Sequence, residues 1–255
     1  MRALLVLTLL ILTACSSSDP ARPPGEIGPM VIGDRDPVDF NRPTPQSFRV
    51  KGTDVARFQS YVDWPRARQV GIQFAFIKAT EGGDLLDPMF KTHWQGAARA
   101  GVKRGAYHFY YFCTAPEVQA RWFIRNVPRT RGALPPVLDM EWNPFSPTCK
   151  RRPDGATVRA EMKTWLDIVE RHYGQRPIIY TTPRFYEENS LGRLREEFWL
   201  STTAKTPREA YPGQRWRFWQ YTATGRLPGT PGDIDLNVFN GSQQDWTTWL
   251  SQRAQ

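Results

Sequence analysis

The sequence predicts an α/β fold, a single domain in which eight strands close into a TIM-like barrel. Two observations carry this prediction. From residue 48 onward, short apolar runs alternate with amphipathic segments in five strand-helix repeats, and three further strand-like runs follow them. Repeated strand-helix units favour a parallel sheet, and eight strands is a number that closes a barrel. The 255 residues suffice for one such domain.

The elements follow in order from short apolar runs for strands, longer amphipathic segments for helices, and glycines that end helices. The expected strands span residues 49–55, 72–79, 104–112, 134–142, 177–181, 197–201, 216–221 and 234–239. The expected helices span residues 61–70, 88–100, 115–126, 156–173 and 183–191. Gly101 and Gly174 directly follow two of these helices, where glycine is common. We therefore expect the barrel to occupy residues 48–252.

The first 47 residues are not expected to belong to the barrel. Residues 1–14 place one arginine before a short apolar run that ends in small residues, the pattern of a secretory signal peptide. The run ends in Leu12-Thr13-Ala14-Cys15, which resembles a bacterial lipobox and implies cleavage before Cys15 and acylation of its thiol. Residues 15–47, rich in proline, would form a tether. Ser16 resembles lipoproteins sorted to an outer membrane, so we expect a location in the cell envelope facing the periplasm.

Charge and cysteine content limit the partners. The formal charge of +9 suggests an anionic partner, although a merely soluble basic protein stays open. The sequence has no zinc-finger spacing, RNP-type motif or compact basic run, so we expect no nucleic acid, no metal and no cofactor. With Cys15 acylated, Cys113 and Cys149 remain, and export favours a disulfide between them over two free thiols. We expect a monomer.

Two acids mark the end of the strand within residues 134–142. Asp139 and Glu141 lie two residues apart, so their side chains share one face of the strand, while Leu138 and Met140 point the other way. In barrels of parallel strands the active site lies at the carboxyl ends of the strands. Two acids there indicate acid/base chemistry on a glycoside or phosphate, or else a metal site. Two solvated acids at a strand end are the plainer alternative.

Seven short motifs follow one another in a fixed order. They are Gly52–Val55, Phe76–Gly82, Gly105–Phe109, Asp139–Glu141, Ile179–Thr181, Trp219–Thr222 and Asp235–Asn237. In this order they resemble the lysozymes of glycoside hydrolase family 25, which are muramidases, and the resemblance covers residues 49–241. It implies a modified (β/α)5β3 barrel that cleaves the β-1,4 bond between N-acetylmuramic acid and N-acetylglucosamine in peptidoglycan.

The resemblance also implies roles for four acids. Glu141 would be the general acid/base, with Asp139 as a charged neighbour that stabilises or orients the intermediate. Asp54 and Asp235 would line the same pocket. The chain departs from the family pattern after Trp199, where a small residue and an aromatic are usual and Leu-Ser-Thr-Thr follows instead. The resemblance therefore does not extend to one wall of the sugar groove.

The residues themselves support this chemistry. Glycoside cleavage needs a protonated carboxyl for the leaving oxygen and a charged group for the oxocarbenium-like transition state. Four acids at one barrel mouth cannot all ionise easily, so like charges would raise one pKa, and we assign that acid to Glu141. Asp139 would either attack carbon or orient the N-acetyl carbonyl of the substrate. We favour the second course, with retention of configuration.

Other polar residues receive weaker assignments. Tyr107 and Tyr180 are expected to bind or orient the sugar, and Gln220 has the parity to face inward and bind substrate. His108 points opposite to Tyr107 and is expected to be a hydrogen-bonded packing residue. Lys78 is expected to pair with a carboxylate of the pocket.

Two alternative functions stay open. A peptidoglycan-binding lipoprotein without catalysis would not need to keep all four acids. A chitinase-like hydrolase would carry the longer acidic run D-x-x-D-x-D-x-E, but Leu134 and Val137 stand at its first two positions.

Overall fold

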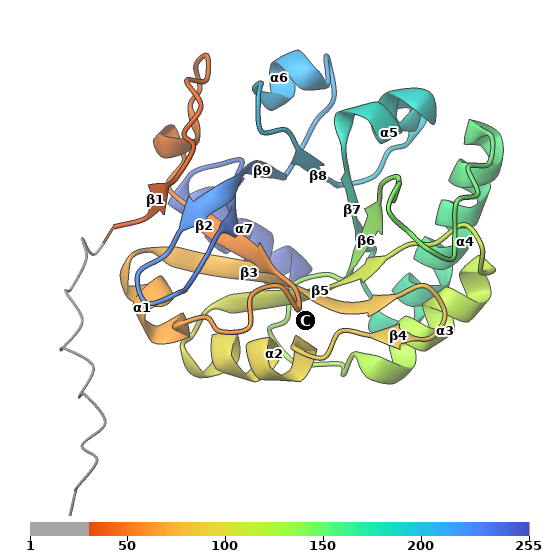
Figure 1. Ribbon diagram of the computed structural model, residues 1–255, viewed down its shortest axis with the longest axis horizontal. Coiled ribbons are helices and arrows are strands. Elements are labelled where there is room, and N and C mark those ends of the chain that lie inside the picture. The colour runs from red at the N-terminus through yellow and green to blue at the C-terminus, as the bar shows by residue number, and fades with distance from the viewer. Residues whose placement is uncertain (1–30, 255) are drawn as a thin grey trace, which may run out of the picture.

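The structure, a computed structural model, describes residues 31–254 and is shown in Figure 1. The expected signal peptide, the lipobox and the first half of the expected tether lie outside the described residues. The strands are β1 (Gly33–Asp34), β2 (Lys51–Val55), β3 (Ile72–Glu81), β4 (Leu85–Leu86), β5 (Lys103–Phe109), β6 (Val137–Met140), β7 (Ile178–Thr181), β8 (Phe198–Ser201), β9 (Phe218–Arg226) and β10 (Ile234–Phe239). The α-helices are α1 (Trp64–Gln69), α2 (Phe90–Arg99), α3 (Pro116–Asn126), α4 (Gly155–Tyr173), α5 (Pro183–Glu188), α6 (Pro207–Ala210) and α7 (Gln243–Arg253). Within the described residues no helix is long and apolar enough to span a bilayer.

Eight strands close the barrel, as predicted. They pair in the order β9-β10-β2-β3-β5-β6-β7-β8, and β8 pairs with β9 to complete the ring. The expectation of a parallel sheet is wrong for β10, which pairs antiparallel with both β2 and β9. The connection between Arg226 and Ile234 is too short for the crossover that parallel neighbours require. The first residues of β10 therefore lie at the carboxyl ends of the other strands.

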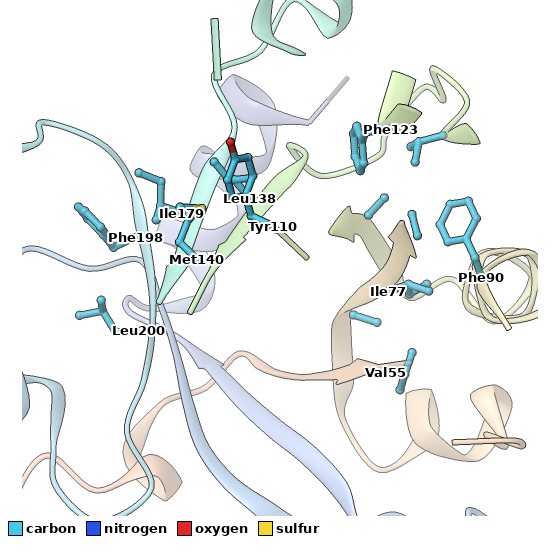
Figure 2. Close-up of a cluster of buried hydrophobic side chains, with 14 of the residues drawn as sticks. Val55, Ile77, Phe90, Tyr110, Phe123, Leu138, Met140, Ile179, Phe198 and Leu200 are labelled. Carbon is cyan, nitrogen blue, oxygen red and sulfur yellow. The ribbon is translucent and has the colours of Figure 1, made fainter. Parts of the chain in front are cut away.

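Alternate strand residues face two separate layers of the core. On β3, Phe74 and Phe76 face the barrel interior, while Ile77 packs in the outer layer between strands and helices. Figure 2 shows this outer layer, in which Leu138 and Met140 of β6 lie with the strand residues Ile179 and Leu200. The β6 side chains thus alternate as the sequence predicts, and the opposite face of β6 remains for the acids.

The helix α7 covers the amino-terminal end of the parallel strands, and the sequence analysis did not predict it. Its Trp246 and Trp249 pack against Phe74 and Phe218, with ring centroids 5.6 Å and 5.3 Å apart. A capping box between Ser242 and Asp245 begins the helix. Because this end is filled by aromatic rings, the open mouth of the barrel lies at the carboxyl ends of the parallel strands.

The fold includes residues that the sequence assigned to the tether. Gly33 and Asp34 pair with β9 as strand β1, and the ring of Phe40 lies 5.0 Å from that of Trp219. From residue 33 onward the chain therefore packs on the barrel, so the tether would be shorter than residues 15–47. The missed signal is the isolated aromatic residue Phe40 in this proline-rich segment.

Candidate active site

A pocket of about 330 Å³ opens at the carboxyl ends of the barrel strands. It receives all four predicted acids and all three predicted substrate-binding residues. Its lining consists of Asp54, Val55, Ala56, Phe58, Gln59, Lys78, Tyr107, Phe109, Asp139, Glu141, Tyr180, Trp199, Gln220, Ala223 and Asp235. One side chain or more from each of the eight barrel strands or the residues that follow them thus reaches a single cavity.

Strand register explains how these acids meet. Asp139 pairs with Phe109 on one side and with Tyr180 on the other, so the three residues lie at one level of the barrel. Asp235 lies directly opposite Asp54, because β10 runs antiparallel to β2. Residues that face each other on antiparallel strands bring their side chains close together. The unpredicted direction of β10 is therefore what carries Asp235 to the mouth.

Asp54 is held by two amides from the last strands. Its Oδ1 accepts hydrogen bonds from Asn237 Nδ2 at 2.8 Å and from Gln220 Nε2 at 3.0 Å. Asn237 is itself fixed by the indole nitrogen of Trp199, which donates to Asn237 Oδ1 at 2.7 Å. Burial raises the pKa of Asp54 to about 6, although these hydrogen bonds favour the charged form and oppose the rise. Burial together with the charge of Asp54 also raises the pKa of Asp235.

The amide of Gln220 is occupied at both ends. Besides donating to Asp54, it accepts hydrogen bonds at Oε1 from Tyr180 at 2.9 Å and from Ser201 at 2.6 Å. The predicted role of Gln220 in substrate binding stays a prediction, and the contacts add a second role as a bridge between Asp54 and Tyr180. Sequence reasoning missed Asn237 and Ser201 as its neighbours.

Asp139 and Glu141 enter the pocket from the end of β6. Asp139 is only 6% exposed, and its Oδ1 has no hydrogen-bond partner among the described residues. Burial, and after it the charge of Glu141, raises the pKa of Asp139. Glu141 lies one residue beyond the strand and is less buried, and its pKa is raised to about 7. The largest cause is burial rather than the repulsion between like charges that the sequence suggested.

Lys78 pairs with an acid that the sequence analysis did not single out. Its Nζ lies 2.6 Å from Glu81 Oε2 and 4.7 Å from the ring centre of Phe109. The expectation that Lys78 pairs with one of the four pocket acids is therefore wrong. Residues three apart on a regular strand face opposite sides, but the pairing of β3 with β5 is irregular between Lys78 and Thr80. That irregularity brings Lys78 and Glu81 together.

The aromatic residues and His108 lie as predicted. Tyr107 and Tyr180 line the pocket, and burial raises both pKa values, so their hydroxyls stay protonated. His108 faces the outer layer, with Nδ1 2.8 Å from Thr80 Oγ1 and Nε2 3.0 Å from Gln119 Oε1. It is a packing residue with two hydrogen-bond partners.

A disulfide joins Cys113 to Cys149. It ties the segment after β5 to the loop after β6, at the rim that carries Glu141. In residues 31–254 no cluster of three histidine, cysteine or acidic side chains has an arrangement that could hold a metal ion. The pocket itself offers carboxyl, phenol, amide and ammonium groups.

Comparisons with known proteins agree with this geometry. Residues 53–230 match the family model "Glycosyl hydrolases family 25". The chain is 37% identical to the uncharacterized protein YegX of Escherichia coli strain K12 over 79% of this chain and 73% of that protein. It is 35% identical to lysozyme M1 of Streptomyces globisporus over 76% and 68%, respectively.

Solved structures give the same result. A family 25 glycosyl hydrolase from Bacillus anthracis superposes with a TM-score of 0.73 at 35% identity, covering 80% of this chain and 94% of that one. A lysozyme from Streptomyces coelicolor superposes with a TM-score of 0.72 at 32% identity, covering 82% and 100%.

Proposed function

The chain belongs to glycosyl hydrolases family 25, and from this premise we propose that it cleaves peptidoglycan between N-acetylmuramic acid and N-acetylglucosamine. Relatives named lysozyme and N,O-diacetylmuramidase support hydrolysis of this polymer. One observation carries the assignment of the acid: Glu141 stands at the mouth with a pKa near 7, beside the buried Asp139. A carboxyl with that pKa can both give and take a proton at neutral pH.

The proposed reaction begins with proton donation. Glu141 protonates the glycosidic oxygen as the bond between this oxygen and the anomeric carbon breaks. The N-acetyl carbonyl oxygen of the substrate attacks that carbon, while Asp139 orients the amide and stabilises its positive charge. Glu141 then removes a proton from the water that opens the intermediate, so the configuration is retained. The positive charge that develops on the substrate amide favours the ionised form of Asp139 and opposes the burial that raises its pKa.

The other pocket residues would prepare the sugar. Tyr107 and Tyr180 supply hydroxyls and ring faces on neighbouring parts of the wall. Asp54 and Asp235 have raised pKa values and can share a proton through a hydrogen bond between their carboxyls. The chitinase-like alternative loses its basis because the chain belongs to another family.

We also propose that the enzyme is a monomeric lipoprotein of the outer membrane, anchored through Cys15 and facing the periplasm. The lipobox-like end of the apolar run supports this. Such an anchor favours a role on the cell's own wall. When cell extracts are separated into a detergent phase and an aqueous phase, replacing Cys15 with serine should move the protein from the detergent phase to the aqueous phase. An unchanged distribution between the two phases would contradict the lipid anchor.

A Glu141→Gln variant tests the catalytic proposal. It should release soluble muropeptides about 10²–10⁴ times more slowly than wild type, because the amide cannot donate the proton. The matched control is Glu187→Gln, which makes the same change at an exposed acid on α5. Clearance of peptidoglycan by Glu141→Gln at the wild-type rate would contradict the assignment. If the wild-type protein bound the cell wall without producing new reducing ends, the alternative of a peptidoglycan-binding lipoprotein without catalysis would be favoured.

A further inference from the structure

A second pocket, of about 180 Å³, adjoins the site beside Glu141. It is lined by Tyr110, Tyr111, Phe112, Glu141, Trp142, Asn143, Pro144, Cys149, Lys150, Arg151 and Arg152. Glu141 is the one residue in the described chain that lines both pockets. The two cavities therefore flank the proposed general acid, and a polymer cleaved beside Glu141 must continue beyond it.

The second pocket has a basic wall. We call residues 143–153, between Trp142 and Asp154, the acidic N-cap of α4, the basic loop; it carries Lys150, Arg151 and Arg152, all exposed. The guanidinium of Arg152 lies 5.1 Å from the ring centre of Trp142. Arg151 Nη1 donates to the Phe112 carbonyl at 2.9 Å. Lys150 forms no ion pair with any described residue.

Nearby acids offset this charge only in part. Glu161 lies 4.0 Å from Arg151, and Glu188 accepts a hydrogen bond from the Trp142 indole at 2.5 Å. Both acids lie outside the pocket lining, where Glu141 is the only acid among the described residues. The pocket therefore presents three cations, an aromatic face and one acid that is proposed to carry a proton.

The basic loop is held in place at several points. The disulfide fixes Cys149 to the segment after β5, and the amide of Cys149 donates to Ser146 Oγ at 3.0 Å. At the start of the loop, Asn143 Nδ2 donates to the Tyr111 hydroxyl at 3.2 Å. A loop tied at both ends presents its charges with a smaller loss of conformational entropy on binding.

We propose that this second pocket binds carboxylates of peptidoglycan stem peptides, so that the enzyme favours glycan strands whose peptides are still attached. The proposal rests on the function proposed above. Alternate sugars of peptidoglycan carry a lactyl-linked peptide with free carboxylates, and a glycan chain leaving Glu141 brings such groups toward the basic loop. Guanidinium and ammonium groups bind carboxylates through charge-assisted hydrogen bonds. The cation–π contact with Trp142 helps to position the Arg152 guanidinium.

The test compares two substrates. One is soluble glycan strands with their stem peptides; the other is the same strands after their carboxyl groups are coupled to methylamine, which removes the charge and keeps the peptide. Wild type should show a kcat/KM about tenfold higher on the charged strands, an effect of the size expected for two or three charge-assisted contacts. The double variant Lys150→Gln/Arg152→Gln should lose this preference and match wild type on the neutral strands. Arg151 is kept, because it holds the Phe112 carbonyl.

The matched control is Arg99→Gln/Arg171→Gln, which changes the net charge equally. These exposed arginines lie in the last turns of α2 and α4, near the amino-terminal ends of the strands and away from the mouth. The control should keep the wild-type preference. Equal losses for Lys150→Gln/Arg152→Gln on both substrates, or no loss, would overturn the proposal.

Phosphate groups of wall polymers are also anionic and could bind the same cations. Treating the substrate chemically distinguishes phosphate from carboxylate. Strands treated with hydrofluoric acid to remove phosphodiester-linked polymers should be preferred as before. A preference that disappears after this treatment would assign the pocket to phosphate and overturn the carboxylate proposal. If wild type cleaves neither substrate, the proposed function fails, and this inference fails with it. Activity without charge preference overturns the inference alone.

Discussion

Replacing Glu141 with glutamine should remove part of the pH dependence of stability. The pKa of Glu141 is raised from 4.5 to about 7 by burial in the folded protein. Between these pH values the folded chain binds more protons than the unfolded chain, so stability falls as pH rises. The contribution of Glu141 is fully present below pH 4.5 and is lost as pH rises through about 7.

The magnitude follows from the size of the shift. A shift of about 2.5 pKa units, from 4.5 to about 7, corresponds to about 3.5 kcal/mol at roughly 1.4 kcal/mol per unit. Residual exposure of Glu141 reduces this to about 2–3 kcal/mol through solvent screening. The charge of Glu141 also raises the pKa of Asp139, so the substitution lowers that pKa. This too makes the variant more stable than wild type at high pH.

Urea unfolding followed by tryptophan fluorescence, at pH 4 and pH 8 with the disulfide intact, measures the effect. The unfolding free energy of Glu141→Gln, compared with that of wild type at the same pH, should rise by about 2–3 kcal/mol between pH 4 and pH 8. Glu187→Gln should show no such growth, since Glu187 is exposed on α5. A Glu141→Gln difference that is the same at both pH values would refute the argument that burial raises this pKa.

Three further changes test other parts of the site. Asn237→Ala removes two buried hydrogen bonds, one of them to Asp54, and should lower the unfolding free energy in urea by about 2–3 kcal/mol; a loss below about 0.5 kcal/mol would contradict this role. Glu81→Gln leaves Lys78 without its counter-charge, so Lys78 should lower the pKa of Glu141 further. The alkaline limb of the pH profile of kcat should then move lower by about half to one pH unit. A shift to higher pH would contradict this effect of Lys78. The two cysteines of the disulfide are 36 residues apart, and replacing both with alanine should lower the free energy of unfolding by about 2–4 kcal/mol in thermal or urea unfolding. Unchanged stability would contradict the expectation that this bond restricts the unfolded chain.

Much of the barrel could be predicted because local pattern and global fold agree. Each β6 residue from Val137 to Met140 faces the layer that its parity indicates, so the inward direction of Asp139 was accessible from the sequence. Helix α4 ends at Tyr173 and is followed by Gly174, which has φ 73°, as a glycine after a helix suggests. These features depend on neighbours in sequence.

The features that were missed depend on how the strands pair and on contacts that exist only in the folded chain. The direction of β10 follows from a short connection, and it decides where Asp235 points. Lys78 meets Glu81 through a local irregularity of β3 that no residue pattern marks. The basic loop looks like an ordinary charged segment in the sequence, and its position beside Glu141 depends on the disulfide and on β5.

The bond that is cut tests the central claim most directly. Peptidoglycan digested by wild type should be reduced with borodeuteride, and the labelled ends identified by mass spectrometry. The account predicts deuterated N-acetylmuramitol ends in the wild-type digest and almost none with Glu141→Gln. Labelled N-acetylglucosaminitol ends, or a wild-type digest without any new reducing ends, would contradict it.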